Sequence, residues 1–181
     1  MLAVFGFCLV WFSGIPEASA TVLVWTNTTA DSSGLWTNGL LWGSASINSY
    51  PGRSAVDDAY ITNSATGAST NIYDQTTTTP LSSVSVWNRL GEAWLVITNS
   101  TMTTAAVLID NGGRLQINNG GILTETAGLT WLGTNGVIYL NTGGQWSTVV
   151  AAVIGNGSSN VTATVSTMSG AGLGGTWNLN G

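Results

Sequence analysis

The sequence contains no histidine, and its three basic residues are all arginines, at positions 53, 89 and 114. The absence of histidine excludes Ser-His-Asp and Cys-His catalysis as well as histidine metal sites, and the absence of lysine excludes Schiff-base chemistry. Nucleic-acid binding is also excluded, because it depends on basic residues that neutralise phosphates. With a net charge of -5, the chain is expected to be repelled by anionic membranes.

Charged residues are scarce as well, at 6% of the chain, whereas hydrophobic residues make up 44%. This balance predicts a folded chain with a buried core, because disordered chains combine low hydrophobicity with high charge. Thr, Ser, Asn and Gly must then make the surface polar, and these residues favour strands and turns. No helical periodicity is present after residue 20, so we expect an all-β fold.

The first twenty residues differ from the rest of the chain. Residues 2–12 are almost wholly apolar and contain Cys8, the sole cysteine, and residues 18–20 read Ala-Ser-Ala. An apolar segment before such a site is typical of a secretory signal peptide, although no basic residue precedes it. We expect residues 1–20 to be removed on export, which leaves a mature chain without disulfides; the alternative is a buried hydrophobic segment.

The second half of the chain repeats itself. Residues 115–124 align with residues 138–147 without a gap, at a spacing in the low twenties, and apolar positions match apolar ones. Weaker echoes occur at residues 95–99, at 129–133 against 151–155, and where Gly174-Gly175 precedes Trp177. The matched positions are Leu115, Ile117, Asn118, Gly120 and Gly121 in one unit and Ile138, Leu140, Asn141, Gly143 and Gly144 in the next.

This repeat predicts a parallel β-helix, or β-solenoid. Alternation places Leu115 and Ile117 on one face of a strand and Gln116 and Asn118 on the other. One unit cannot bury its apolar face, but stacked units cover one another. Two interior columns are therefore expected: Leu95, Leu115 and Ile138 in one, and Ile97, Ile117 and Leu140 in the other.

The polar positions of the repeat are expected at its corners. Asn118 and Asn141 can hydrogen-bond to each other along the axis of the stack. The glycine pairs can supply the positive φ angles that tight corners need. The structural alternative is a β-sandwich, which also has short strands and frequent turns.

We expect three regions: a signal peptide at 1–20, an irregular N-terminal cap with the first coils at 21–92, and solenoid repeats of about 20–24 residues at 93–181. Residues 22–25, 56–61 and 81–87 are predicted strands of the second region, and Pro51-Gly52 is a predicted turn. The last residues resemble a repeat without a cap. The sequence therefore suggests a fragment, or a subunit that stacks end to end.

The chain resembles a known group of proteins in its N-terminal tryptophans, in residues 57–61 and in its Leu-x-Ile-x-Asn-x-Gly-Gly units. It is similar to secreted bacterial autotransporter-passenger-like proteins, some of which carry a PEP-CTERM sorting tag. The resemblance implies a right-handed β-helix and a role in adhesion at a surface or in a matrix. It covers most of residues 21–181, but the motifs are degenerate, and neither a translocator barrel nor a sorting tag is present.

Carboxylates and arginines remain as candidates for chemistry. The acids after residue 20 are Asp31, Asp57, Asp58, Asp74, Glu92, Asp110 and Glu125. Asp57 and Asp58 are adjacent and should face opposite ways, with one turned inward near Arg53. Asp110 precedes Asn-Gly and is predicted to be a turn residue. We expect no catalytic residue, metal or cofactor; a fragment of a polysaccharide-active enzyme is the remaining alternative.

Eight tryptophans follow residue 20. Leu123, Trp146 and Trp177 share one repeat position and are expected to form an interior column. Exposed tryptophans could instead stack on sugar rings, and the candidates are Trp36, Trp42 and Trp87. We predict a non-catalytic extracellular structural protein of a surface layer, matrix, adhesin stalk or fibre, whose partner is itself or an extracellular polysaccharide. The alternative is a carbohydrate-binding module.

Overall fold

The computed structural model of the 181-residue chain describes residues 21–27, 31–43, 49–53, 56–76, 79–88, 90–127, 130–133, 135–148, 152–154, 164–166 and 176–179. The predicted signal peptide, Arg89 and the glycine pair Gly174-Gly175 lie outside the described residues.

The described chain consists almost entirely of short strands, with one turn of 3-10 helix, η1 (Gly39–Trp42). Thr, Val, Ile and aromatic residues supply the strands, and Asn-Gly or Gly-Gly steps separate many of them. The strands are β1 (Val22–Asn27), β2 (Ser32–Leu35), β3 (Asp58–Asn63), β4 (Ala68–Tyr73), β5 (Leu81–Asn88), β6 (Glu92–Ile97), β7 (Thr101–Asp110), β8 (Arg114–Ile117), β9 (Ile122–Glu125), β10 (Thr130–Leu132), β11 (Val137–Leu140), β12 (Gln145–Thr148), β13 (Ala152–Ile154), β14 (Thr164–Ser166) and β15 (Thr176–Leu179).

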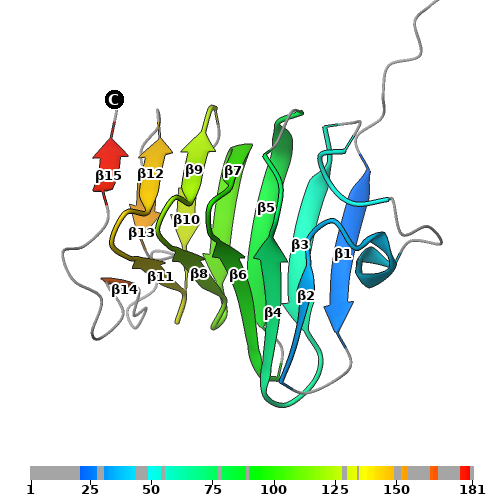
Figure 1. Cartoon of the computed structure of the whole chain (residues 1–181). Coiled ribbons are helices and arrows are strands. Elements are labelled where there is room, and N and C mark those ends of the chain that lie inside the picture. The colour runs from blue at the N-terminus through cyan, green and yellow to red at the C-terminus, as the bar shows by residue number, and fades with distance from the viewer. Residues whose placement is uncertain are drawn as a thin grey trace, which may run out of the picture.

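The strands form a parallel β-solenoid (Figure 1). One sheet has the order β1-β3-β5-β7-β9-β12-β15, and the other has the order β14-β11-β8-β6-β4-β2, so that successive coils lie side by side along one axis. Every pairing among the described strands is parallel. The predicted fold class is confirmed, and the β-sandwich alternative is wrong, because sandwich sheets are antiparallel.

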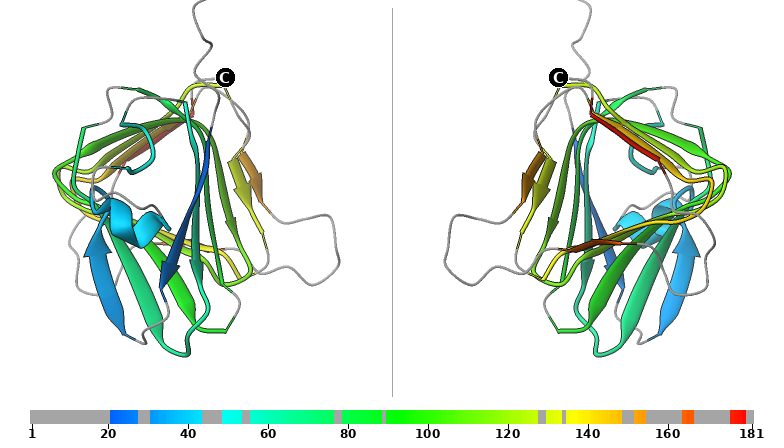
Figure 2. Two further views of the ribbon diagram at one scale, coloured as in Figure 1. Left: turned by 90° about the vertical axis from the view of Figure 1, so that its right-hand side faces the viewer. Right: turned by 90° about the vertical axis from the view of Figure 1, so that its left-hand side faces the viewer.

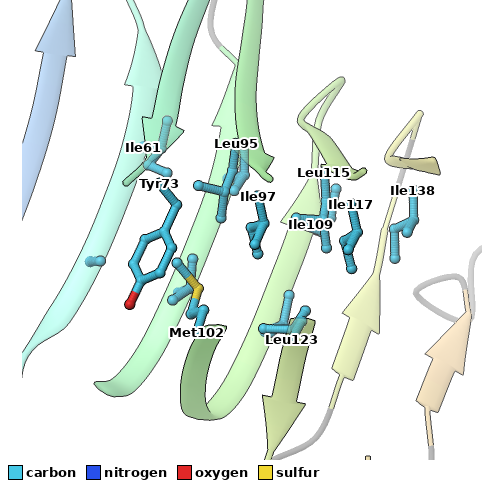
Figure 3. Packing of buried hydrophobic residues seen from close by; sticks show 14 of the residues in the cluster. Ile61, Tyr73, Leu95, Ile97, Met102, Ile109, Leu115, Ile117, Leu123 and Ile138 are labelled. Atoms are coloured by element: carbon cyan, nitrogen blue, oxygen red, sulfur yellow. The ribbon is translucent and has the colours of Figure 1, made fainter. Parts of the chain in front are cut away.

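The two interior columns predicted from the repeat are present, and every member is buried. Strand register places them in line: Leu95, Leu115 and Ile138 in one column, and Ile97, Ile117 and Leu140 in the other. Figure 3 shows members of both columns among the buried side chains of the core. Each such aliphatic side chain contributes about 1.5–3 kcal/mol through its burial.

Strand β7 bends in its middle, where the alternation of buried and outward positions is interrupted. Its buried positions are Met102 and Thr104 before the bend and Val107 and Ile109 after it, so the alternation changes phase at residues 105–106. The first part pairs with β9 and the second with β10. The later coils are therefore built from more, shorter strands than the first ones, and Figure 2 shows β10 and β13 set apart on one side of the coil.

The N-terminal coils belong to the same two sheets and are closed by an aromatic cluster. Trp42 contacts both Trp25 and Trp36 edge to face, with ring centroids 5.4 and 4.6 Å apart, and Trp36 contacts Tyr73 at 5.1 Å. Helix η1 carries Trp42 and lies against β1. The predicted 92/93 boundary falls within β6, and the sheets run through it without interruption.

Candidate functional site

A ladder of polar side chains follows one corner of the solenoid. Asn141 Nδ2 donates a hydrogen bond to Asn118 Oδ1 at 2.8 Å, and Asn118 Nδ2 donates to Thr98 Oγ1 at 3.0 Å. Gln116 Nε2 also donates to Asn118 Oδ1, at 2.8 Å. The predicted hydrogen bond between Asn118 and Asn141 is confirmed. Because its members come from three successive coils, the ladder ties those coils together in register.

The two glycines of each pair serve different purposes. Gly120 and Gly143 adopt positive φ angles of 68° and 74°, as predicted for tight corners. Gly121 and Gly144 have no such angle; a Cβ there would overlap the carbonyl oxygen of Ile97 or Ile117 in the preceding coil. The first glycine is thus required by conformation and the second by the close approach of two backbones.

Two of the three tryptophans predicted to bind sugar are buried. Trp36 and Trp42 are 0% and 2% exposed. Their indole nitrogens donate to backbone oxygens, that of Trp36 to Pro51 O at 2.9 Å and that of Trp42 to Trp36 O at 2.7 Å. The prediction that these two rings form an exposed sugar-stacking surface is wrong, because they fill the N-terminal core.

The repeat position shared by three residues is an interior column where its side chains are described. Leu123 and Trp146 are neighbours in register and are both buried. The Trp146 indole nitrogen donates to Glu125 Oε2 at 3.0 Å, and Glu125 is fully buried. The backbone of Trp177 pairs with that of Trp146, as the alignment predicted; its side chain lies outside the described residues.

Several carboxylates hold the backbone. Asp57 is buried and accepts from the amides of Gly52 and Thr21, at 3.0 and 3.3 Å. Asp58, its neighbour, accepts from Ser83 Oγ at 2.6 Å. Asp74 accepts from both the amide and the hydroxyl of Thr37, at 3.0 and 2.6 Å. These three carboxylates therefore fix loops and strand edges.

Asp110 lies at a turn, as predicted. Its carbonyl accepts from Gly113 N at 2.8 Å, and its Oδ1 accepts from Asn111 N at 2.8 Å. Asn111 and Gly112 both adopt positive φ angles. Among the described residues, no group of three or more His, Cys, Asp or Glu side chains could hold a metal ion.

One ion pair lies on the outer face of the second sheet. Arg114 Nη2 is 3.6 Å from Glu92 Oε1, and Trp94 Nε1 donates to Glu92 Oε2 at 2.9 Å. Arg114 Nη1 donates to the backbone oxygens of Gly112 and Asn135, both at 2.8 Å. Through Nη1 the guanidinium thus connects the turns of two successive coils.

Two hollows open at the corner between β7 and β8. The aromatic hollow, of about 490 Å³, is lined by Tyr60, Trp87, Leu108, Asp110 and Asn111. The polar hollow, of about 460 Å³, is lined by Asn88, Glu92, Asn111, Gly112, Arg114, Asn135 and Val137. Asn111 belongs to both, so they meet at this residue.

Of the residues predicted to bind sugar, Trp87 alone lies in such a hollow. Its neighbours Tyr60, Leu108 and Asn111 were not predicted to bind a ligand. The first two occupy outward positions of strands on either side of β5, and their proximity depends on a register that the repeat does not define.

No helix among the described residues is long and apolar enough to cross a membrane. Comparison of the chain with protein-family models, with curated proteins and with solved structures found no match.

Proposed function

We propose that the chain is a non-catalytic, extracellular structural protein whose solenoid forms a rigid scaffold in a surface layer, matrix, adhesin stalk or fibre. The observation that carries this proposal is the sheet that continues in parallel register from β1 to β15. Such a sheet gives each coil hydrogen bonds and side-chain packing on both sides, so stiffness accumulates along the axis.

The use of polar groups supports the same function. Asp57 and Asp74 are bound by backbone amides, and the Asn118–Asn141 hydrogen bond joins successive coils. These groups act on the protein's own framework. Asn, Thr and Ser elsewhere keep the outer surface polar with few charges, which suits a protein that functions outside the cell in contact with other polymers.

Export is the part of the proposal that rests on residues 1–20. An antibody against the solenoid, applied to fractions of the source cells, should find the protein at the surface or in the medium. Mass spectrometry should show a mature N-terminus close to Thr21. Retention in the cytoplasm with residues 1–20 intact would contradict the extracellular role.

The non-catalytic part has its own test. Purified protein is incubated with a panel of polysaccharides, and new reducing ends or unsaturated products are measured. We expect no product above that of heat-inactivated protein. Product formation that is lost in Glu92→Gln or Asp110→Asn would favour the polysaccharide-active alternative instead.

Self-association end to end is the expected mode of assembly. In the described chain β1 pairs only with β3 and β2 only with β4, so each has one edge without a paired strand, and such edges favour pairing with another chain. Electron microscopy and mass photometry of the purified protein should show filaments or a concentration-dependent mass. A stable, monodisperse monomer would contradict assembly into fibres.

A further inference from the structure

Two residues that line the aromatic hollow, Tyr60 and Leu108, lie on either side of a small residue. Ser85 on β5 occupies an outward position, and its lateral neighbours are Tyr60 on β3 and Leu108 on β7. Although it faces outward, Ser85 is only 4% exposed, because the larger side chains cover it. Tyr60 and Leu108 therefore approach each other over Ser85, and both line the hollow in the outer face of the sheet.

Trp87 extends this hollow toward the corner. It lies two residues beyond Ser85 on the same strand, and therefore on the same face, and its partner in register is Asp110. Tyr60 and Trp87 are both partly exposed and both line the hollow. Two aromatic rings at one outward-facing hollow provide a flat apolar surface that is weakly hydrated.

The polar edge of the hollow is rigidly held. Asn111 N donates to Asp110 Oδ1, and Asn111 Nδ2 donates to the Asn88 carbonyl in the preceding coil. Within the described parts of the chain, no hydrogen bond involves Asp110 Oδ2. That oxygen is therefore able to accept a hydrogen bond from a ligand lying on the rings.

The polar hollow offers a second acceptor across the corner. The side-chain oxygen Oδ1 of Asn88 is buried and has no hydrogen-bond partner in the described residues. Asn88 lines the polar hollow, which meets the aromatic hollow at Asn111. A buried acceptor without a partner costs about 1–3 kcal/mol. Because Oδ1 has no accessible surface, the Asn88 side chain must turn into the hollow before a ligand hydroxyl can donate to it and remove that cost.

We propose that this corner is a binding site for a neutral polysaccharide. A sugar ring has apolar C–H faces, which stack on Trp87 and Tyr60, and equatorial hydroxyls, which donate to Asp110 Oδ2. The following sugar unit crosses the corner at Asn111 and donates to Asn88 Oδ1. Flat apolar surface next to fixed acceptors is the chemistry that recognises such a ligand.

The charges around the site favour a neutral glycan over an acidic one. Asp110 lines the aromatic hollow and Glu92 lines the polar hollow, and both carboxylates would repel uronic acids or sulfated sugars. Arg114 is the single cation in the lining, and it is bound to Glu92 and to backbone carbonyls. This site is independent of the scaffold function, because a solenoid can serve as a scaffold with or without it.

The test uses the full mature chain and isothermal titration calorimetry with hexasaccharides of three neutral polymers, namely cellohexaose, xylohexaose and maltohexaose, and with hexagalacturonate. We expect at least one neutral hexasaccharide to bind more tightly than hexagalacturonate. Trp87→Ala should weaken that binding roughly tenfold or more, and Tyr60→Ala should weaken it by a smaller factor.

The matched control is Tyr139→Ala, which removes an aromatic ring from the outer face of the other sheet, where Tyr139 stacks on Trp94. We expect its affinity to stay within about twofold of the wild type. Circular dichroism and thermal melts confirm that each variant is folded; if Trp87→Ala is not, Trp87→Phe and Tyr60→Ala provide the comparison. Absence of binding to all neutral hexasaccharides, a preference for hexagalacturonate, or an equal loss in Tyr139→Ala would overturn the proposal.

Discussion

Ile117 lies directly beside Leu140 of the next coil, and both side chains point into the solenoid. Gln116, the residue before Ile117, faces the opposite way and is partly exposed. A difference of one position along the strand therefore separates the dry interior from the solvated surface, which allows a direct test of the inside-outside assignment.

Ile117→Asp should be severely destabilising, by about 4 kcal/mol or more, because it places a carboxylate among aliphatic side chains without a partner. Gln116→Asp should cost about 1 kcal/mol, the value of the lost hydrogen bond to Asn118. Urea denaturation followed by circular dichroism measures both free energies of unfolding. Comparable losses in the two variants would show that the assigned faces are wrong.

The polar ladder gives a prediction that concerns hydrogen bonding alone. Asn118→Ala removes the hydrogen bonds that Asn118 Oδ1 accepts from Asn141 and Gln116, and should cost about 1–3 kcal/mol. Asn118→Asp should cost less, because a carboxylate still accepts from Asn141 and can accept from the Thr98 hydroxyl. Thermal melts of the two variants test the order of stability.

The control is Asn119→Ala, whose side chain is exposed and which should change stability by less than about 0.5 kcal/mol. If Asn119→Ala lowered the stability as much as Asn118→Ala does, the ladder would have no special role in stability.

The glycine pairs make a third prediction, because their two members are constrained differently. Gly120 has a φ of 68°, which asparagine tolerates, and its Cβ would mainly displace the side-chain oxygen of Asn99, which can rotate away, so Gly120→Asn should cost about 1 kcal/mol. Gly121→Ala should cost several times as much, since its Cβ would overlap the backbone of the preceding coil and force the coils apart. Chemical denaturation gives both values. A milder effect for Gly121→Ala than for Gly120→Asn would contradict the assigned roles.

The sequence predicted the middle of the solenoid well because the constraint there is repeated. Leu115 and Ile138 occupy equivalent positions, and matched glycines fix the corners between them, so an alignment also gives the register. The bend at residues 105–106 was not predictable in this way. Ala105 and Ala106 lie at the bend, and alanine occurs on both inward and outward faces of strands. The sequence therefore does not show where the alternation changes phase.

Tryptophan was the residue type that the sequence described least well. Trp36 and Trp87 both occur in polar, turn-rich surroundings, yet Trp36 fills the N-terminal core and Trp87 lines a surface hollow. An indole suits both environments, because it has a large apolar body and one donor that a backbone oxygen can satisfy. Strand register and the path of the chain between strands determine whether each tryptophan is buried or at the surface. Neither can be inferred from the sequence of the N-terminal half, which has no clear repeat.

The contact between Glu125 and Trp146 carries the last prediction, because it joins two interior columns. Trp146 lies in the apolar column of Met102 and Leu123, and Glu125 lies in the buried polar column of Thr104 and Thr148. Glu125→Gln keeps an oxygen that can accept from the indole nitrogen and should cost about 1 kcal/mol or less. Glu125→Leu removes the Oε2 acceptor of that buried nitrogen and should cost about 1–3 kcal/mol more than Glu125→Gln. Combining Glu125→Leu with Trp146→Phe removes both partners, so the double variant should be more stable than the sum of the two single losses predicts. Free energies of unfolding from urea melts of the wild type, Glu125→Leu, Trp146→Phe and the double variant complete this thermodynamic cycle. Additive losses would mean that the hydrogen bond contributes nothing to the stability of the column, and that the carboxyl group of Glu125 is held there by its other contacts.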